Sequence, residues 1–151
     1  MKGTRRILWS FLALALLGAT GAPAQEKRLK KSDLPAPVLK TADDQSKGAT
    51  VRGYSSEVED GQLQYEVAMT VNGHSRDVSI AADGSVLEVE EEVALSALPA
   101  AVREGLQKKA GAGKIMKVES LTKHGTLVAY EAQVRSEVQV GPDGQSLAHE
   151  E

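Results

Sequence analysis

The sequence predicts an α+β protein made of two tandem repeats, each with one helix packed on an antiparallel sheet of about four strands. The first observation is a repeat: residues 32–38 return 64 positions later as 96–102, with five of seven identical. The second is the apolar–polar alternation over 62–71, which is typical of a strand with one buried face. The third is the set of Gly-containing turns after each helix. A repeat of this length indicates one supersecondary unit used twice.

The first 24 residues have the pattern of a secretory signal peptide. Basic residues at 2, 5 and 6 precede an apolar run over 7–17, and Ala22-Pro23-Ala24 supplies the small residues that a signal peptidase requires. The apolar run is shorter than the roughly 20 residues of a membrane-spanning helix, so a retained anchor is the less favoured alternative. We expect cleavage after Ala24 and a periplasmic or secreted mature protein with no membrane attachment.

The composition of the mature chain excludes some classes of partner. The signal holds three basic residues and no acidic one, so its removal takes the net charge from −3 to −6. An acidic chain is poorly suited to nucleic acid and to anionic lipid. The chain has no cysteine, so no disulfide can stabilise it and its stability must come from a packed core.

The first unit is expected over 32–93, after a charged and flexible leader over 25–31. Ser32 or Asp33 can cap its helix by accepting from a free backbone N–H, and two prolines fall in the first turn, where no helical partner is lost. Gly48 ends the helix. The helix face that points to the core consists of Leu34, Val38, Ala42 and Gln45.

The sheet of the first unit is expected to be a meander of hairpins, because Gly and Asn tolerate the positive φ of tight turns. The acidic run over 90–92 is expected to be a solvated stretch between the units, since an oxygen-ligand metal cage needs more converging ligands than a short run supplies. The expected elements are the turn Asp60-Gly61, the strand 62–71, the turn Asn72-Gly73, a strand at Val78 and Ile80, the turn Asp83-Gly84 and a strand over 85–89.

The second unit, over 94–151, is expected to repeat this plan. Ser96 caps its helix and the run Gly111-Ala112-Gly113 ends it. The apolar stripe of the helix is Leu98, Ala101, Val102 and Leu106. The expected sheet elements are a strand over 115–121, the turn His124-Gly125, a strand over 128–134, a strand at Val138 and Val140, and the turn Asp143-Gly144.

No catalytic constellation, cofactor site or metal site is predicted. A nucleophile needs a base and an acid within reach, and the histidines fall in two turns and the tail. His74 with Asp77, and His149 with the last two glutamates, are left as weak metal-binding alternatives. The Gly-rich run before Lys114 follows a helix instead of preceding one, so it is not a phosphate loop.

The order and motifs of the two units resemble the PepSY domain family, in particular its PepSY-like variant related to β-lactamase-inhibitor folds. The matching residues are Leu34-Pro35, Val38, Tyr65-Glu66-Val67 and Asp83-Gly84, then Leu98-Pro99, Val102, Tyr130-Glu131 and Asp143-Gly144. The resemblance implies a small exported α+β module without catalytic residues. It also implies a role in restraining a peptidase or binding a partner at the cell envelope.

The sequence therefore predicts a non-catalytic exported binding module, whose partner is another envelope or secreted protein, such as a peptidase that it inhibits or regulates. The alternative is a periplasmic protein that senses a small ligand or a divalent cation. The candidate partner-binding residues lie in two turns, Asn72-Gly73-His74 and His124-Gly125.

Overall fold

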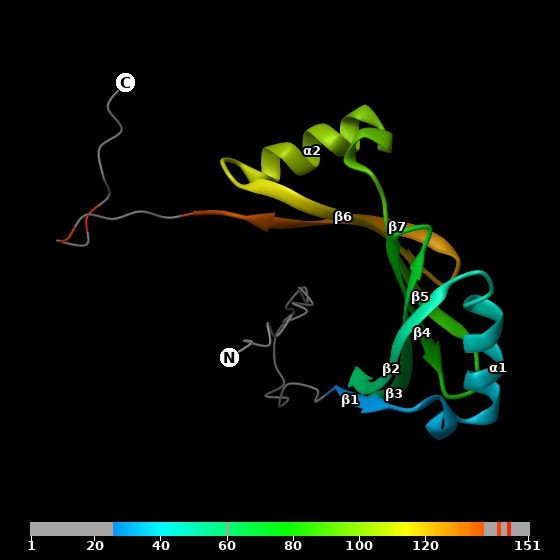
Figure 1. The fold of residues 1–151 in the computed structure, drawn as a ribbon. Coiled ribbons are helices and arrows are strands. Elements are labelled where there is room, and N and C mark those ends of the chain that lie inside the picture. Colours follow the sequence, from blue (N-terminus) through cyan, green and yellow to red (C-terminus); the bar gives the residue numbers. More distant parts are fainter. Residues whose placement is uncertain (1–25, 60, 138–141, 143–144, 146–151) are drawn as a thin grey trace.

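The computed structural model describes residues 26–59, 61–137, 142 and 145, and the structural statements below refer to these. Seven strands form one antiparallel sheet in which each strand pairs with the next along the chain (Figure 1). The strands are β1 (Lys27–Leu29), β2 (Thr50–Glu59), β3 (Gln62–Val71), β4 (His74–Ala81), β5 (Val86–Glu92), β6 (Lys114–Lys123) and β7 (Thr126–Arg135). The helices are α1 (Ala36–Gln45) and α2 (Ala100–Ala110), each preceded by a short 3-10 turn, Lys31–Asp33 and Leu95–Ala97.

The sheet is continuous, and the prediction of two repeats that each carry their own sheet is wrong. Strand β5 pairs with β6 from Glu88↔Lys123 to Glu92↔Glu119, so the two halves of the chain share one sheet. The halves are also unequal, with five strands before α2 and two after it among the described residues. A sequence repeat specifies local elements, but not how the copies join. An unpaired edge on β5 would expose its backbone N–H and C=O groups, and β6 satisfies them.

Strand β1 is absent from the sequence prediction, and β2 is implied there only by the hairpin turn Asp60-Gly61, without bounds. Part of the expected flexible leader, Lys27–Leu29, is a strand that pairs with β2, with Leu29 opposite Tyr54. In β2 the register shifts between Val51 and Gly53, and two serines are buried at Ser55 and Ser56. Both features obscure the apolar–polar alternation by which a strand is recognised.

Both helices begin later than predicted. The N-cap of α1 is Pro35 and that of α2 is Pro99, and neither cap makes a side-chain hydrogen bond. Asp33 instead accepts at Oδ2 from the backbone N–H of Lys30 (2.9 Å) within the preceding 3-10 turn. The cause is the residue before each proline, Leu34 or Leu98, which is extended with ψ of 134° or 152° because the proline ring disfavours helical backbone there.

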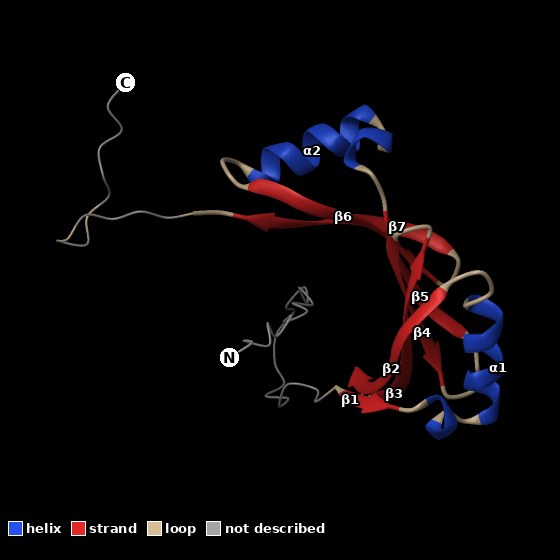
Figure 2. Ribbon diagram, viewed as in Figure 1, coloured by secondary structure: helices blue, strands red, loops and turns tan. Residues whose placement is uncertain are grey.

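Both helices lie on the outer side of the bent sheet (Figures 1 and 2). The core lies where α1 packs on β3 and β4, and it is aliphatic. Its buried members are Leu34, Val38, Ala42, Val67, Met69, Val78 and Ile80. The second half of the chain has a smaller core. Leu98 and Val118 are its buried apolar residues in the described part, and no residue of α2 is buried. The apolar burial that stabilises the fold is therefore concentrated in the first half.

The turn between β4 and β5 lies directly against α1. Gly84 has a φ of 90°, and a Cβ placed on it would lie 2.8 Å from the carbonyl oxygen of Pro37. The hydroxyl of Thr41 donates to the carbonyl oxygen of Gly84 at 2.6 Å. This turn thus requires glycine both for its backbone conformation and for its contact with the helix.

Candidate functional site

The face of the sheet opposite α1 and α2, which we call the helix-free face, carries mainly charged side chains. Strand pairing and alternation place these residues side by side, with Asp77 opposite Glu90 and Ser55 opposite Glu66. Acidic side chains outnumber basic ones on this face. The acidic members on β2 to β6 are Glu57, Glu59, Glu66, Asp77, Glu88, Glu90, Glu92 and Glu119, and the basic side chains among them are Arg52, Lys117 and Lys123.

Three carboxylates from adjacent strands converge at the centre of this face. Asp77 on β4, Glu90 on β5 and Glu119 on β6 each offer an oxygen atom, and these atoms lie within 4.8 Å of one another. Asp77 is 4% exposed and Glu119 is 8% exposed. We call these three residues the carboxylate trio.

Basic side chains hold two of the three carboxylates. Arg52 donates from Nη2 to Oδ1 of Asp77 at 2.8 Å, and it also donates from Nε to the carbonyl oxygen of Met69. Lys117 donates from Nζ to Oε1 of Glu119 at 2.5 Å. The second oxygen of Asp77, Oδ2, is buried and has no hydrogen-bond partner. An unpaired buried carboxylate oxygen is costly, so this atom requires an explanation.

The electrostatics of the face favour protonated carboxyl groups. Burial, reinforced by the carboxylates of Glu119 and Glu88, raises the pKa of Glu90 well above its usual range. Burial and the Asp77 carboxylate raise the pKa of Glu66 to about 7. Burial also raises the pKa of Asp77, although Arg52 opposes that shift. These carboxyl groups keep their protons to a higher pH than ordinary carboxyls do. A cation bound beside them would favour their charged form and so their deprotonation.

The acidic run over 90–92 is not the solvated stretch that the sequence predicted. It belongs to β5, so its side chains alternate between the two faces. Glu90 and Glu92 lie on the helix-free face, and Glu91 points to the other side, opposite Arg76. The oxygen Oε2 of Glu92 accepts from the backbone N–H of Ser75 at 3.0 Å. The register shift between Ser79 and Ile80 hid the strand alternation, so the sequence held no clear signal of this site.

The structure places the two predicted contact turns at opposite ends of the sheet. Asn72-Gly73-His74 joins β3 to β4, and His124-Gly125 joins β6 to β7. The backbone N–H of His124 donates to the carbonyl oxygen of Leu87, near the start of β5. The turn Asn72-Gly73-His74 lies at the other end of the strands, where β4 begins. Both turns have the positive φ values expected of hairpins. The two turns do not form one contact surface.

The weak metal alternatives from the sequence do not gain support. His74 and Asp77 both lie on β4, but His74 is not among the residues whose ligand atoms converge with those of Asp77. The Nδ1 atom of His74 instead lies 3.6 Å from Oε1 of Glu92. His149 and its neighbouring glutamates lie outside the described residues.

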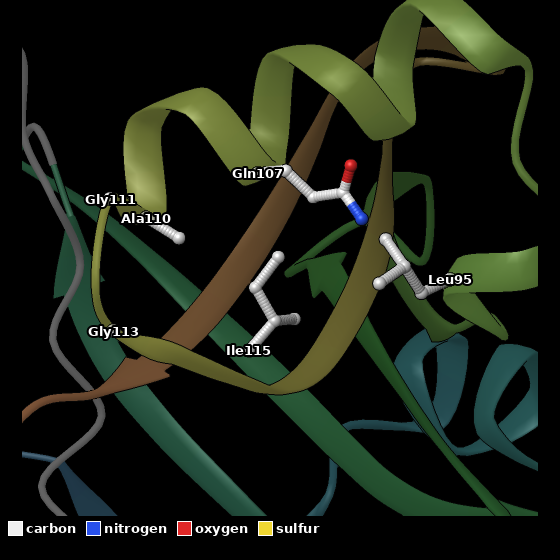
Figure 3. A pocket seen from close by; sticks show the side chains of 6 residues that line it. All are labelled: Leu95, Gln107, Ala110, Gly111, Gly113 and Ile115. Atoms are coloured by element: carbon white, nitrogen blue, oxygen red, sulfur yellow. The ribbon is translucent and has the colours of Figure 1, made fainter.

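A space of about 260 Å³ lies between α2 and β6, as Figure 3 shows. It is lined by Leu95, Gln107, Ala110, Gly111, Gly113 and Ile115. Gln107 supplies the one polar side chain of this lining, and no acid, base or nucleophile accompanies it. The space offers no catalytic chemistry and is a packing gap beneath the loosely packed α2.

No protein family model and no curated protein matches this chain. Several solved structures resemble it, three of which are described here. A BLIP-like protein of Bacteroides fragilis is 14% identical, with 72% of this chain and 93% of that chain covered and a TM-score of 0.46. A protein of Bacteroides thetaiotaomicron, provisionally described as calcium-regulated and periplasmic, is 16% identical, with 70% and 96% covered and a TM-score of 0.38.

The third structure is a protein of the DUF2874 family from Bacteroides vulgatus, provisionally described as periplasmic. It is 16% identical, with 74% of this chain and 99% of that chain covered and a TM-score of 0.38. At these identities and TM-scores the three likenesses assign neither a family nor a function to this chain. Within the described residues, no helix has the length and apolar character needed to cross a membrane.

Proposed function

We propose that this chain is an exported, non-catalytic binding module that contacts another envelope or secreted protein through the helix-free face. The observation that carries the proposal is the arrangement of the sheet: both helices cover one face, and the other presents charged side chains from adjacent strands. The signal-like first 24 residues support export, with cleavage after Ala24.

The charge of the face sets the chemistry of the partner. Because acidic side chains outnumber basic ones there, the partner surface should be basic, and complementary charge would speed association and fix its orientation. A continuous sheet holds these side chains in place before binding, which lowers the entropy lost on association. The PepSY-like motifs make a peptidase the first class of partner to test.

Affinity capture with matched variants tests this proposal. Tagged residues 25–151 are exposed to the host's envelope and secreted fractions, and retained proteins are identified by mass spectrometry. The face variant carries Glu59→Lys and Glu131→Lys, two exposed sites on the helix-free side. The control carries Glu91→Lys and Glu104→Lys, two exposed sites on the helix side with the same change in charge.

The proposal expects at least one protein that the wild type and the control retain and the face variant loses, with retention that weakens as salt is raised. A peptidase among these proteins would then be titrated with the wild-type chain to measure inhibition. Capture of nothing, or equal capture by both variants, would contradict the use of this face.

A further inference from the structure

We propose that Asp77, Glu90 and Glu119 form a binding site for a hard divalent cation, Ca²⁺, at the centre of the helix-free face. Three adjacent strands supply one carboxylate each, and the nearest oxygen atoms of the three lie within 4.8 Å of one another. The site belongs to the sheet itself, and its occupancy does not depend on the protein partner proposed above.

The buried oxygen of Asp77 is the observation that points to a ligand. Asp77 is 4% exposed and its Oδ2 has no hydrogen-bond partner, while Oδ1 is fixed by Arg52 at 2.8 Å. A protein rarely leaves a buried carboxylate oxygen unpaired, because neither water nor a donor then repays its desolvation. A cation held between the three carboxylates would give this atom its partner.

Two of the carboxylates are already oriented. Arg52 holds one oxygen of Asp77, and Lys117 holds Oε1 of Glu119 at 2.5 Å. The second oxygen of Asp77, Oδ2, has no hydrogen-bond partner and is left for another ligand. Hydrogen bonds of this kind are what fix ligating carboxylates in metal sites.

The geometry and the ligand atoms favour Ca²⁺. All three candidate ligands are carboxylate oxygens, the donors that Ca²⁺ prefers, and no histidine or cysteine of the described chain joins the group. Calcium–oxygen distances are about 2.3–2.6 Å, so two ligands on opposite sides of the ion lie roughly 5 Å apart. The three candidate ligand atoms lie within 4.8 Å of one another, close enough for one ion to contact all three. Glu90 is only partly buried, which leaves room for the water ligands that would complete an irregular shell.

The basic side chains that orient the carboxylates also limit the affinity of the site for Ca²⁺. Arg52 and Lys117 neutralise part of the negative charge of the trio, and three protein ligands are fewer than a high-affinity loop supplies. The dissociation constant should therefore fall in the range of extracellular calcium modules, about 10⁻⁴ to 10⁻³ M.

Thermal unfolding with matched variants tests the site. The mature chain, treated with chelator and dialysed, is melted in 10 mM CaCl₂ and in 30 mM NaCl, which has the same ionic strength. A ligand that binds only the folded state raises the midpoint, here by about 5 °C for the wild type. Glu90→Gln should abolish this shift. Glu91→Gln removes the same charge one residue away on the other face and should retain it.

Calorimetric titration with Ca²⁺ gives an independent readout, in which the wild type should bind one ion and Glu119→Gln should lose at least tenfold in affinity. Either of two results would overturn the site. One is the absence of both heat and a midpoint shift up to 10 mM Ca²⁺. The other is the same shift in Glu90→Gln as in the wild type, since the ion would then act elsewhere on the surface.

Discussion

Neutralising Glu66 should stabilise the protein at alkaline pH and leave it nearly unchanged at acidic pH. Glu66 lies in the middle of β3 on the helix-free face and is partly buried. Burial and the Asp77 carboxylate raise its pKa to about 7, from an ordinary value of 4.5. The folded chain therefore keeps a proton that the unfolded chain has lost at neutral pH. The contribution of this proton to stability is complete below about pH 4.5 and disappears as the pH rises through about 7.

The size of this stabilisation follows from the pKa shift of Glu66. Each pKa unit corresponds to about 1.4 kcal/mol, so the full shift of Glu66 sets an upper limit of about 3 kcal/mol at pH 8. Because the carboxylate is only partly buried and water can approach it, we expect the Glu66→Gln variant to gain about 1 to 3 kcal/mol in the free energy of unfolding at pH 8. At pH 4.5 the gain should fall within about 0.5 kcal/mol, since the wild-type carboxyl is then protonated in the folded state.

Urea unfolding in the presence of EDTA, at pH 4.5 and pH 8, measures this difference without interference from metal ions. The control is Glu131→Gln, which removes the same charge from an exposed position on the same face and should change stability equally little at both pH values. The reasoning would be refuted by a Glu66→Gln gain that is equal at the two pH values, or by a control that gains as much as Glu66→Gln at pH 8.

Two further predictions use the internal repeat and the turns as sources of matched pairs. Val38→Ala removes two fully buried methyl groups and should lower the free energy of unfolding in urea by about 2 to 3 kcal/mol. Val102→Ala, at the equivalent and partly exposed position of α2, should lower it by less than about 1 kcal/mol. Equal losses would contradict the uneven distribution of the core. The Cβ of Gly84→Ala would clash with the carbonyl oxygen of Pro37, whereas Gly61 has a similar positive φ but open space around it. Gly84→Ala should therefore lower the melting midpoint more than Gly61→Ala. A smaller loss for Gly84→Ala would mean that the contact with α1 relaxes freely.

Local patterns in the sequence predicted the local features of the fold. The helices, the strand over 62–71 and the hairpin turns at Asn72-Gly73 and His124-Gly125 are confirmed. These features depend on residues close together in the chain, such as an Asn-Gly pair that tolerates positive φ. The joining of the two halves was not predictable in the same way. The pairing of Glu92 with Glu119 depends on contacts between distant segments that carry no local signature.

The candidate site was missed for the same reason. Asp77, Glu90 and Glu119 come from three strands, and no short spacing pattern connects them in the sequence. Their proximity follows from the registers of β4 with β5 and of β5 with β6. Sequence reasoning instead favoured turn residues, because loops are common contact sites, and it treated the acidic run as one unit although strand alternation divides it between two faces.

The pairing of β5 with β6 also has a consequence for how the chain folds. Among the described residues, the first half contains seven of the nine buried apolar residues, whereas the second half has a helix with no buried residue. We therefore expect the edge of β5 to act as a template on which β6 and β7 add during folding. Amide hydrogens in β3 and β4 should exchange with solvent only on global unfolding, while those of α2 and β7 should exchange through cheaper partial openings. The two copies of the repeat would thus behave as a nucleus and its extension.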